Sequence, residues 1–410
     1  MADLSYIDLF AGAGGLSEGF NREGYKPIAH VEMDKDASDT LKTRETVLYL
    51  NRAKNLSAYY SYLKNEISRD ELWSKVPEEL FQSVINVEIS LDTIPKIFRQ
   101  IRQLNYGRKV DVIIGGPPCQ AYSLVGRSRD PNGMKNDARN YLFRYYAQFL
   151  FRYKPKYFVF ENVLGILTAG NRRYLNEMIQ LFESIGYSVA EPTVLLAEEY
   201  GVLQKRRRVV VIGRRGKRKF DFPQPEVISN SWQIKPDLFY DLPKLKPGDD
   251  LMVAKYIKPI NQYLKDTHIR NGSSFVTQHT ARPHNEQDLE IYKIAIDKWI
   301  NERQRLKYSD IPQRLQSHNN TVSFLDRFKV VDLFGHSHTL VAHIAKDGHY
   351  YIYPDLKQVR SISVREAARI QSFPDDYYFE GGRTAAFKQI GNAVPPLMAQ
   401  AIAKKLLELF

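Results

Sequence analysis

SYIDLFAGAGG, residues 5–15, decides the fold, because a short apolar strand leads directly into a glycine-rich turn. The residues that follow, LSEGFNREGY, have the pattern of a short helix that ends at Gly24. A glycine-rich turn between a strand and a helix lets bare backbone approach a nucleotide-like cofactor. A tight turn that binds no ligand would carry the same glycines, so both interpretations stay open here.

The alternation of strands and helices continues to about residue 215. Further strands are predicted at 27–34, 109–116, 154–163, 188–196 and 207–214, and further helices at 35–44, 141–153 and 177–187. Because the strands alternate with helices and are apolar on both faces, we predict an α/β fold with a mostly parallel sheet.

Two regions depart from this rhythm. Residues 45–85 are predicted to form one or two surface helices inserted between elements of the sheet. A solvated elaboration is favoured over a contact with DNA or a partner. The irregular residues 216–355 predict a second domain, in which TLVAHI (339–344) and HYYIYP (349–354) form paired strands. The stretch 393–410, AVPPLMAQAIAKKLLELF, predicts an amphipathic helix begun by proline.

The charge balance favours a polyanionic partner. The 410 residues include 59 basic and 47 acidic ones, for a formal net charge of +12. Residues 205–219 include nine basic residues and no acid. This segment could form a solvated edge or a contact with nucleic acid. The single cysteine excludes an internal disulfide and indicates a reducing, cytoplasmic setting, and no apolar run reaches the roughly 18 residues of a membrane span.

Three side chains at predicted strand ends could carry chemistry. The only cysteine, Cys119, follows Gly-Gly-Pro-Pro, and its thiolate would be a strong nucleophile. Glu161 ends a neighbouring strand, where it could bind a heterocycle or merely cap a turn. Glu32 lies 20 residues after Gly12, as expected of a ribose-binding acid, although Ser17 replaces the third glycine of a dinucleotide fingerprint and weakens a nicotinamide interpretation.

Six motifs together resemble those of the C5-cytosine DNA methyltransferases, in the family's order. They are DLFAGAGG, GGPPCQAYS, ENV, QKRRRVVVIG, RSISVREAARIQSFPDDY and QIGNAVPP, and they span roughly residues 5–44, 87–215 and 337–403. The resemblance implies a Rossmann-like methyltransferase sheet that binds S-adenosylmethionine, with a second, smaller target-recognition domain. It places the catalytic domain at 1–215 and 388–410 and the small domain at 216–387.

The resemblance also implies a mechanism. Cys119 attacks C6 of a flipped-out cytosine, and Glu161 binds N3 and the exocyclic amine. Arg208 matches the arginine that holds O2, and Arg206 a neighbouring arginine of the site. C5 then takes the methyl group of S-adenosylmethionine, which leaves as S-adenosylhomocysteine, and loss of the C5 proton expels Cys119.

Further residues are implied by matching positions. The cofactor positions are Phe10, Ala11, Gly12, Gly14, Leu16, Glu32, Met33, Glu88, Ile89, Pro117, Leu142, Asn392 and Val394. Glu88 stands where the family's adenine-binding motif has Asp. The predicted DNA contacts are Gln120, Ser123, Arg127, Gln204, Arg270, Asn271, Gln278 and Arg282. Residues 124–141 match the loop that closes over DNA.

The implied partner is double-stranded DNA, with a cognate restriction endonuclease that acts separately. We expect a monomer and no metal, because no cysteine or acid cluster joins the three histidines of 336–343. Transfer-RNA methylation and a catalytically silent DNA-binding regulator are the alternatives. The silent regulator would need a lost nucleophile or acid, and Cys119 and Glu161 are both present.

Overall fold

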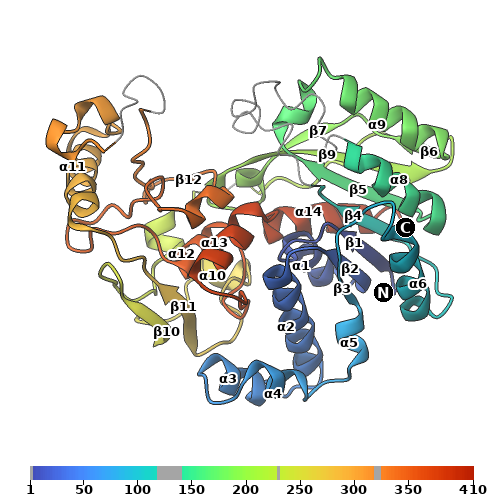
Figure 1. Ribbon diagram of the computed structural model, residues 1–410, viewed down its shortest axis with the longest axis horizontal. Helices are drawn as coiled ribbons and strands as arrows, with labels where there is room; N and C mark the ends of the chain where they lie inside the picture. Colours follow the sequence, from blue (N-terminus) through green and yellow to red (C-terminus); the bar gives the residue numbers. More distant parts are fainter. Residues whose placement is uncertain (1–2, 118–140, 229–230, 318–324) are drawn as a thin grey trace.

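The fold is built on one twisted sheet of the order β3-β2-β1-β4-β5-β9-β6, with β7 beside β9. The computed structural model describes residues 3–117, 141–228, 231–317 and 325–410 (Figure 1). The strands of this sheet are β1 (Ser5–Leu9), β2 (Lys26–Glu32), β3 (Val84–Asn86), β4 (Val112–Gly115), β5 (Tyr157–Asn162), β6 (Tyr187–Val189), β7 (Thr193–Leu196) and β9 (Arg207–Arg215).

Five neighbouring strands, β3-β2-β1-β4-β5, run parallel, as the sequence predicts. β9 is antiparallel to β5, β6 and β7. The stretch 188–196, predicted as one strand, contributes to β6 and β7 instead. Pro192 lies between these two strands and has no N–H group to donate to a ladder.

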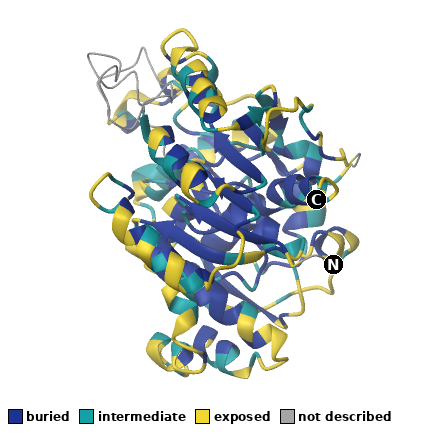
Figure 2. Cartoon of the chain, turned by 90° about the vertical axis from the view of Figure 1, so that its right-hand side faces the viewer, coloured by how far each residue is buried: buried dark blue, intermediate teal, exposed yellow. Residues whose placement is uncertain are grey.

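Two layers of helices cover the sheet. Ile7 packs with α6, α8 and α9 on one face, and Tyr6 packs with α1 and α14 on the other. Figure 2 shows buried strands between helices whose outer sides are exposed. The helices are α1 (Gly15–Arg22), α2 (Lys35–Arg52), α6 (Ile94–Asn105), α8 (Leu142–Tyr153), α9 (Arg173–Ser184) and α14 (Pro396–Leu407), with the 3₁₀ turns η2 (Leu164–Leu167) and η3 (Ala197–Tyr200).

α1 and α14 approach backbone to backbone. A Cβ atom on Gly15 would lie 2.2 Å from the carbonyl oxygen of Val394, and one on Gly19 would lie 2.4 Å from the backbone nitrogen of Gln400. Only glycine fits at these two positions of α1. No helix within the described residues is long and apolar enough to cross a membrane.

Residues 231–354 form the small lobe, which lies to the left of the sheet lobe in Figure 1. Its elements are η4 (Ile234–Leu238), β10 (Asp250–Lys255), α10 (Gln262–Asp266), β11 (Phe275–Thr280), α11 (Glu286–Glu302), η5 (Tyr308–Asp310), η6 (Gln313–Leu315), β12 (Ser337–His338) and η7 (Ala342–Ala345). α12 (Val364–Ile370) and α13 (Arg383–Asn392) lead back to the sheet lobe, and β8 (Gln204–Lys205) pairs with β12.

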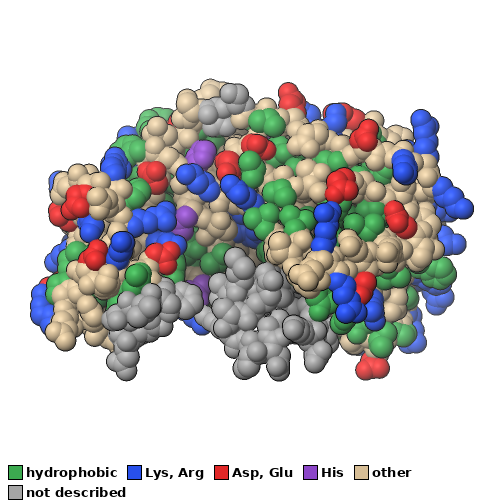
Figure 3. Space-filling view, turned by 90° about the horizontal axis from the view of Figure 1, so that it is seen from above, with side chains coloured by type: hydrophobic (Ala, Val, Ile, Leu, Met, Phe, Trp, Pro, Cys, Tyr) green, Lys and Arg blue, Asp and Glu red, His purple; other side chains and the backbone are tan. Residues whose placement is uncertain are grey.

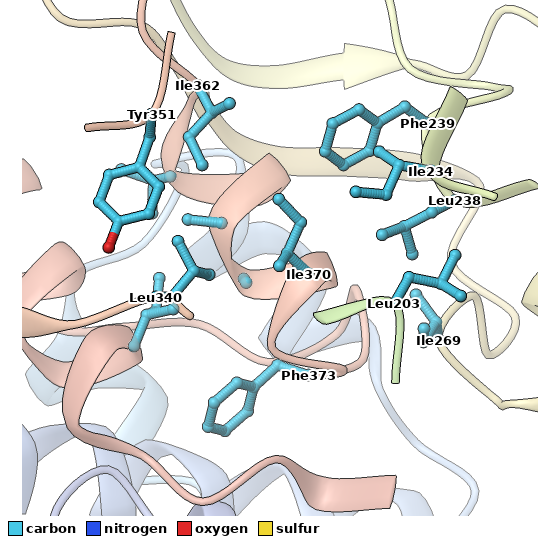
Figure 4. Packing of buried hydrophobic residues seen from close by; sticks show 14 of the residues in the cluster. Leu203, Ile234, Leu238, Phe239, Ile269, Leu340, Tyr351, Ile362, Ile370 and Phe373 are labelled. Carbon is cyan, nitrogen blue, oxygen red and sulfur yellow. The ribbon is translucent and has the colours of Figure 1, made fainter. Parts of the chain in front are cut away.

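The two lobes share one hydrophobic core. Leu203 of the sheet lobe packs with Ile234 and Leu340 of the small lobe and with Ile370 and Phe373 beside α12 (Figure 4). Because these side chains are buried only when the lobes are in contact, their burial stabilises the arrangement of the lobes as well as each lobe.

The predicted strand pair 339–344 and 349–354 is wrong. The Leu340 N–H donates to Oε1 of Gln204, and the Val341 N–H donates to the Tyr351 hydroxyl, so these donors are used by side chains. η7 follows at once, and Ile352 forms only isolated bridges with Val330 and Ser361. Bonds from distant side chains therefore override the local strand pattern.

The insertion packs against the small lobe. It consists of the end of α2 with α3 (Ser57–Leu63), α4 (Arg69–Trp73) and α5 (Glu79–Gln82). Tyr59 and Tyr62 share a buried cluster with Phe275 of β11, and the Tyr59 hydroxyl donates to the carbonyl oxygen of Asp376 at 2.6 Å. The prediction of a solvated elaboration is therefore wrong for the inner face of the insertion, which braces β11 and the segment after α12.

Tyr62→Phe should lower the free energy of unfolding. The Tyr62 hydroxyl donates to both carboxylate oxygens of Glu380, at 2.8 and 2.9 Å, and burial already raises the pKa of this carboxyl. Loss of this bond should cost about 1–3 kcal/mol, measured by urea denaturation. Tyr49→Phe, at a tyrosine that is 37 % exposed on α2, is the matched control. Equal midpoints for the two variants would contradict the bracing role.

Candidate active site

The carboxyl ends of five parallel strands place the predicted site residues along one edge of the sheet. Glu32 ends β2, Gly115 ends β4, and Glu161 and Asn162 end β5. Open α/β sheets bind ligands at this edge, because the loops there are free to vary while the strands hold them. The sequence-predicted site residues of the sheet lobe are thus brought together by the parallel order of the strands.

The glycine-rich turn after β1 is shaped by close contacts. Gly12 and Gly14 have φ angles of +55° and +76°, in the left-handed region. A Cβ atom on Gly14 would lie 2.7 Å from the Leu41 side chain and 2.9 Å from the Tyr377 hydroxyl. A side chain at Gly14 is therefore excluded by strain and by space. Phe10 and Ala11 begin this turn, and Leu16 is buried behind it in α1.

Glu32 is held rigidly at the end of β2. Its Oε2 accepts from the Gly12 N–H and its Oε1 accepts from the Asp34 N–H, both at 2.7 Å. Burial raises the pKa of Glu32, and the two backbone N–H groups partly oppose that rise. Such a carboxylate retains acceptor capacity for hydroxyl groups placed above the turn.

The other predicted cofactor positions differ in how far they are exposed. Met33 is 62 % exposed, and the Val87 N–H donates to the Glu32 carbonyl, which brings the segment of Glu88 and Ile89 alongside. Ile89 is buried and Glu88 is exposed. Pro117 and Val394 are buried, Leu142 is half-buried and Asn392 is exposed. An exposed apolar side chain beside a fixed acid and a bare turn fits an adenosine group.

Sequence reasoning missed Asn86 as part of this region. Its amide nitrogen donates to the carbonyl oxygens of Glu32 and Met33, at 3.0 and 3.1 Å, and to the Ser38 hydroxyl. It therefore fixes the turn that carries Glu32 and Met33. The signal available in the sequence is that this asparagine begins the stretch NVEIS, residues 86–90, which contains Glu88 and Ile89.

Glu161 and Arg208 form an ion pair at the end of β5. Nε of Arg208 lies 2.5 Å from Oε1 of Glu161, and both side chains are mostly buried. The antiparallel pairing of β5 with β9 brings these two motifs together. A Cβ atom on Gly116 would lie 2.7 Å from Oε2 of Glu161, so glycine at this position leaves room for the carboxylate.

Cys119 lies outside the described residues, as do Gln120, Ser123, Arg127 and the rest of the loop predicted to close over DNA, apart from Tyr141. The chain is described up to Pro117, two residues before Cys119. The Asn162 amide donates to the Pro117 carbonyl at 3.5 Å, so the segment that leads to Cys119 is joined to the strand of Glu161.

A pocket of about 320 Å³ adjoins the ion pair. It is lined by Val163, Leu164 and Gly165 after β5, by Lys205, Arg207 and Arg208, and by Thr339 of the small lobe. Figure 3 shows a hollow in the surface, along which His, Lys and Arg side chains gather. Both lobes therefore contribute to one positively charged pocket.

Arg206, predicted to be catalytic, has a fully buried side chain that donates to backbone carbonyl oxygens of two other segments. The acceptors are Leu340, Gly391 at 3.3 Å and Ala393 at 2.8 Å. Arg206 points into the shared core, whereas its neighbours Lys205, Arg207 and Arg208 line the pocket. The catalytic role of Arg206 stays a prediction.

Four of the predicted DNA contacts pair with other parts of the chain, and two of them are buried. Gln204 bonds to Leu340 and Gln371, and Gln278 bonds to both backbone polar groups of Phe379. The polar groups of these two side chains are therefore already paired within the fold, and their contact with DNA stays a prediction. The remaining two are Arg270, which lies 2.9 Å from Asp241, and Arg282, which donates to the carbonyl oxygens of residues 344–346.

Asn271 differs from these four residues, because its side chain is exposed. Its role in DNA contact stays a prediction.

Comparison with known families and proteins yields consistent matches over nearly the whole chain. The family model described as C-5 cytosine-specific DNA methylase matches residues 4–56 and 63–408. The type II methyltransferase M.Bpa9945I of Bacillus paralicheniformis is 43 % identical, over 97 % of both chains. M.AgeI of Thalassovita gelatinovora, also a type II methyltransferase, is 30 % identical over 98 % of this chain and 99 % of its own.

Solved structures are similar in fold. A DNA modification methyltransferase encoded within an E. coli prophage superposes with a TM-score of 0.63 at 22 % identity, over 99 % of each chain. The methyltransferase EhMeth of Entamoeba histolytica has a TM-score of 0.55 at 15 % identity, over 100 % of this chain and 99 % of its own. At these identities the likeness shows the fold alone.

Arg206→Lys should destabilise the junction of the lobes. An ammonium group cannot reach all three carbonyl groups as the planar guanidinium does, and each buried carbonyl left unpaired costs about 1–3 kcal/mol. We expect the free energy of unfolding to fall by about 2–5 kcal/mol in urea denaturation. The exposed neighbour Arg207→Lys is the control and should unfold like the unaltered chain. A stable Arg206→Lys variant would contradict this role.

Proposed function

Because the chain belongs to the C-5 cytosine-specific DNA methylase family, we propose that it is the modification methyltransferase of a type II restriction–modification system. It transfers a methyl group to C5 of a cytosine within a specific duplex sequence. The observation that carries the proposal is the Glu161–Arg208 pair beside a basic pocket to which both lobes contribute.

The methyl donor of this family, S-adenosylmethionine, supplies an electrophilic methyl group when it is bound. We propose that Glu32 accepts hydrogen bonds from its ribose hydroxyls, while Met33 and Ile89 contact the adenine. Glu88 receives the adenine amine, and the bare turn at Gly12 and Gly14 approaches the methionine part. The rigid carboxylate of Glu32 and the open space beside Gly12 support this placement. Phe10, Ala11, Leu16, Pro117, Leu142, Asn392 and Val394 are proposed to complete the site.

The cytosine is activated by groups on both sides of the pocket. Cys119 forms a bond to C6, and the electron pair displaced from the ring makes C5 nucleophilic. Glu161 binds N3 and the exocyclic amine, and Arg208 binds O2, so the charge that develops on the ring is stabilised. After C5 is methylated, loss of its proton restores the double bond and expels the Cys119 thiolate.

The substrate is double-stranded DNA with the target base turned out of the helix, at a cost of a few kcal/mol. The net charge of +12 and the pocket side chains Lys205 and Arg207 suit phosphate groups. We propose that the small lobe is the target-recognition domain. The protein would act in the cytoplasm as a monomer that needs no metal, and its cognate endonuclease would act separately.

Bisulfite sequencing tests the reaction and the target together. Unmethylated DNA is incubated with the protein and S-adenosylmethionine, and we expect protected cytosines in one short recurring context. The absence of protection, with cofactor binding verified by calorimetry, would refute DNA methylation and favour an RNA substrate or a silent regulator.

Glu161→Gln should abolish most methyl transfer. An amide cannot bind N3 and the exocyclic amine as the carboxyl group does, so we expect the rate to fall by at least about 100-fold. Cofactor binding should be retained, since Glu161 lies away from Glu32. Glu191→Gln, at an acid that is 82 % exposed in its pair with Arg172, is the matched control. The readout is tritiated methyl transfer, and wild-type rates in Glu161→Gln would remove this acid from the mechanism.

As the pH is lowered, cofactor binding should begin to weaken at a higher pH than it would if Glu32 were an exposed glutamate. Burial raises the pKa of Glu32, so this carboxylate is protonated, and loses acceptor capacity, before ordinary glutamates titrate at about pH 4.3. Calorimetric titration with S-adenosylmethionine should show that Glu32→Gln binds about tenfold more weakly and has lost this pH dependence. Glu302→Gln, at an exposed acid of α11, should keep it. If both variants still lost affinity at the same low pH, the pH dependence would belong to a group other than Glu32.

A further inference from the structure

The rim of the pocket beside Arg208 continues into one short segment of the small lobe. Thr339 lines the pocket itself, and its hydroxyl donates to the Lys205 carbonyl at 2.6 Å. Two residues later, Val341 is 45 % exposed, one of the large apolar side chains on the surface. Residues 339–343 therefore lead from the proposed cytosine pocket to an exposed apolar side chain two residues away.

The inner side of this segment is fixed by buried polar groups. Gln204 accepts from the Leu340 N–H at 2.8 Å, and Arg206 donates to the Leu340 carbonyl. The Tyr351 hydroxyl donates to the Thr339 carbonyl at 2.9 Å and accepts from the Val341 N–H at 3.1 Å. The backbone polar groups on both sides of Leu340 are thus satisfied from within the fold.

The far end of the segment is fixed as well. Arg282 donates to the carbonyl oxygens of Ile344, Ala345 and Lys346, at 2.9–3.2 Å. A Cβ atom on Gly391 of α13 would lie 2.4 Å from the carbonyl carbon of Val341. The segment therefore rests directly on the backbone of α13, and only its outward side chains are free to meet another molecule.

The outward side chains are Val341 and His343. His343 is 35 % exposed, its ring meets Tyr350 edge to face at 5.9 Å, and Nε2 lies 3.9 Å from Asp347. An apolar side chain that stays exposed on a rigid backbone adds no hydrophobic stabilisation to the isolated chain, because its surface remains in contact with water. A rigid exposed patch beside a catalytic pocket instead lowers the entropic cost of binding a partner.

We propose that residues 339–343 read the base pairs next to the target cytosine, with Val341 in apolar contact with a base edge and His343 in hydrogen-bond contact. This inference rests on the proposed function, because the partner it names is the duplex that delivers the cytosine. The thymine methyl group and the acceptors of the major groove are the matching chemistry. Lys205 and Arg207, on the same pocket, hold the adjoining phosphates.

This assignment also explains two of the inward-facing polar residues. Gln204 and Arg282 bind the backbone at the two ends of residues 339–343. The polar groups that make these bonds are used within the fold. They are positioning residues, and contact with DNA is made by the side chains between them.

The test compares Val341→Ala and His343→Ala with Val253→Ala. Val253 is 37 % exposed on β10, which lies in the lower part of the small lobe in Figure 1, away from β12, and is the matched control. On a duplex that carries the site found by bisulfite sequencing, kcat/KM should fall about tenfold in Val341→Ala. A similar or larger loss is expected for His343→Ala. Because these side chains are exposed, thermal stability and S-adenosylmethionine binding should not change.

The sites methylated by each variant give the second readout. Val341→Ala or His343→Ala should accept substitutions at a position next to the cytosine that the unaltered chain rejects. Unchanged rates and unchanged sites in both variants would overturn the inference and leave the proposed function intact. Failure of the proposed function shows itself differently, since the unaltered chain would then methylate no DNA.

Discussion

The buried guanidinium of Arg206 is the interaction on which the arrangement of the lobes depends. Arg206 directly precedes β9, the strand that carries Arg208. Its guanidinium donates to carbonyl groups of the small lobe and of the segment before α14. An uncompensated guanidinium in the core would be very costly, so the three segments must meet for any of them to be stable. One contact holds Leu340 within residues 339–343, and another holds Ala393, which lies beside Gly15.

The sheet and the cofactor region could be predicted from local patterns. The strands β1, β2, β4 and β5, the turn at Gly12 and the acid at Glu32 each follow from apolar runs and from residues that permit unusual backbone angles, whereas the short strand β3 was not predicted. The parallel order then brings the strand ends together without further information, so Glu32 and Glu161 lie at one edge. Arg208 meets Glu161 because β9 pairs with β5. This contact could be expected only from the resemblance to the family.

The direction of polar side chains could not be predicted. Gln204, Arg206, Gln278 and Arg282 have the composition of DNA contacts, yet each binds backbone groups more than 60 residues away in sequence. The strand pair expected at 339–354 fails for the same reason, because Gln204 and Tyr351 use its donors. Contacts of this kind depend on the assembled fold, which no local pattern records.

The close approach of α1 and α14 has a consequence for synthesis on the ribosome. The bare backbone of Gly15 and Gly19 is covered by residues 394–400, which are translated long after α1. A nascent chain can form much of the sheet early, but the turn that opens α1 gains its support only when α14 emerges. Because contacts so distant in sequence form late, methylating activity should be withheld from incomplete chains during translation.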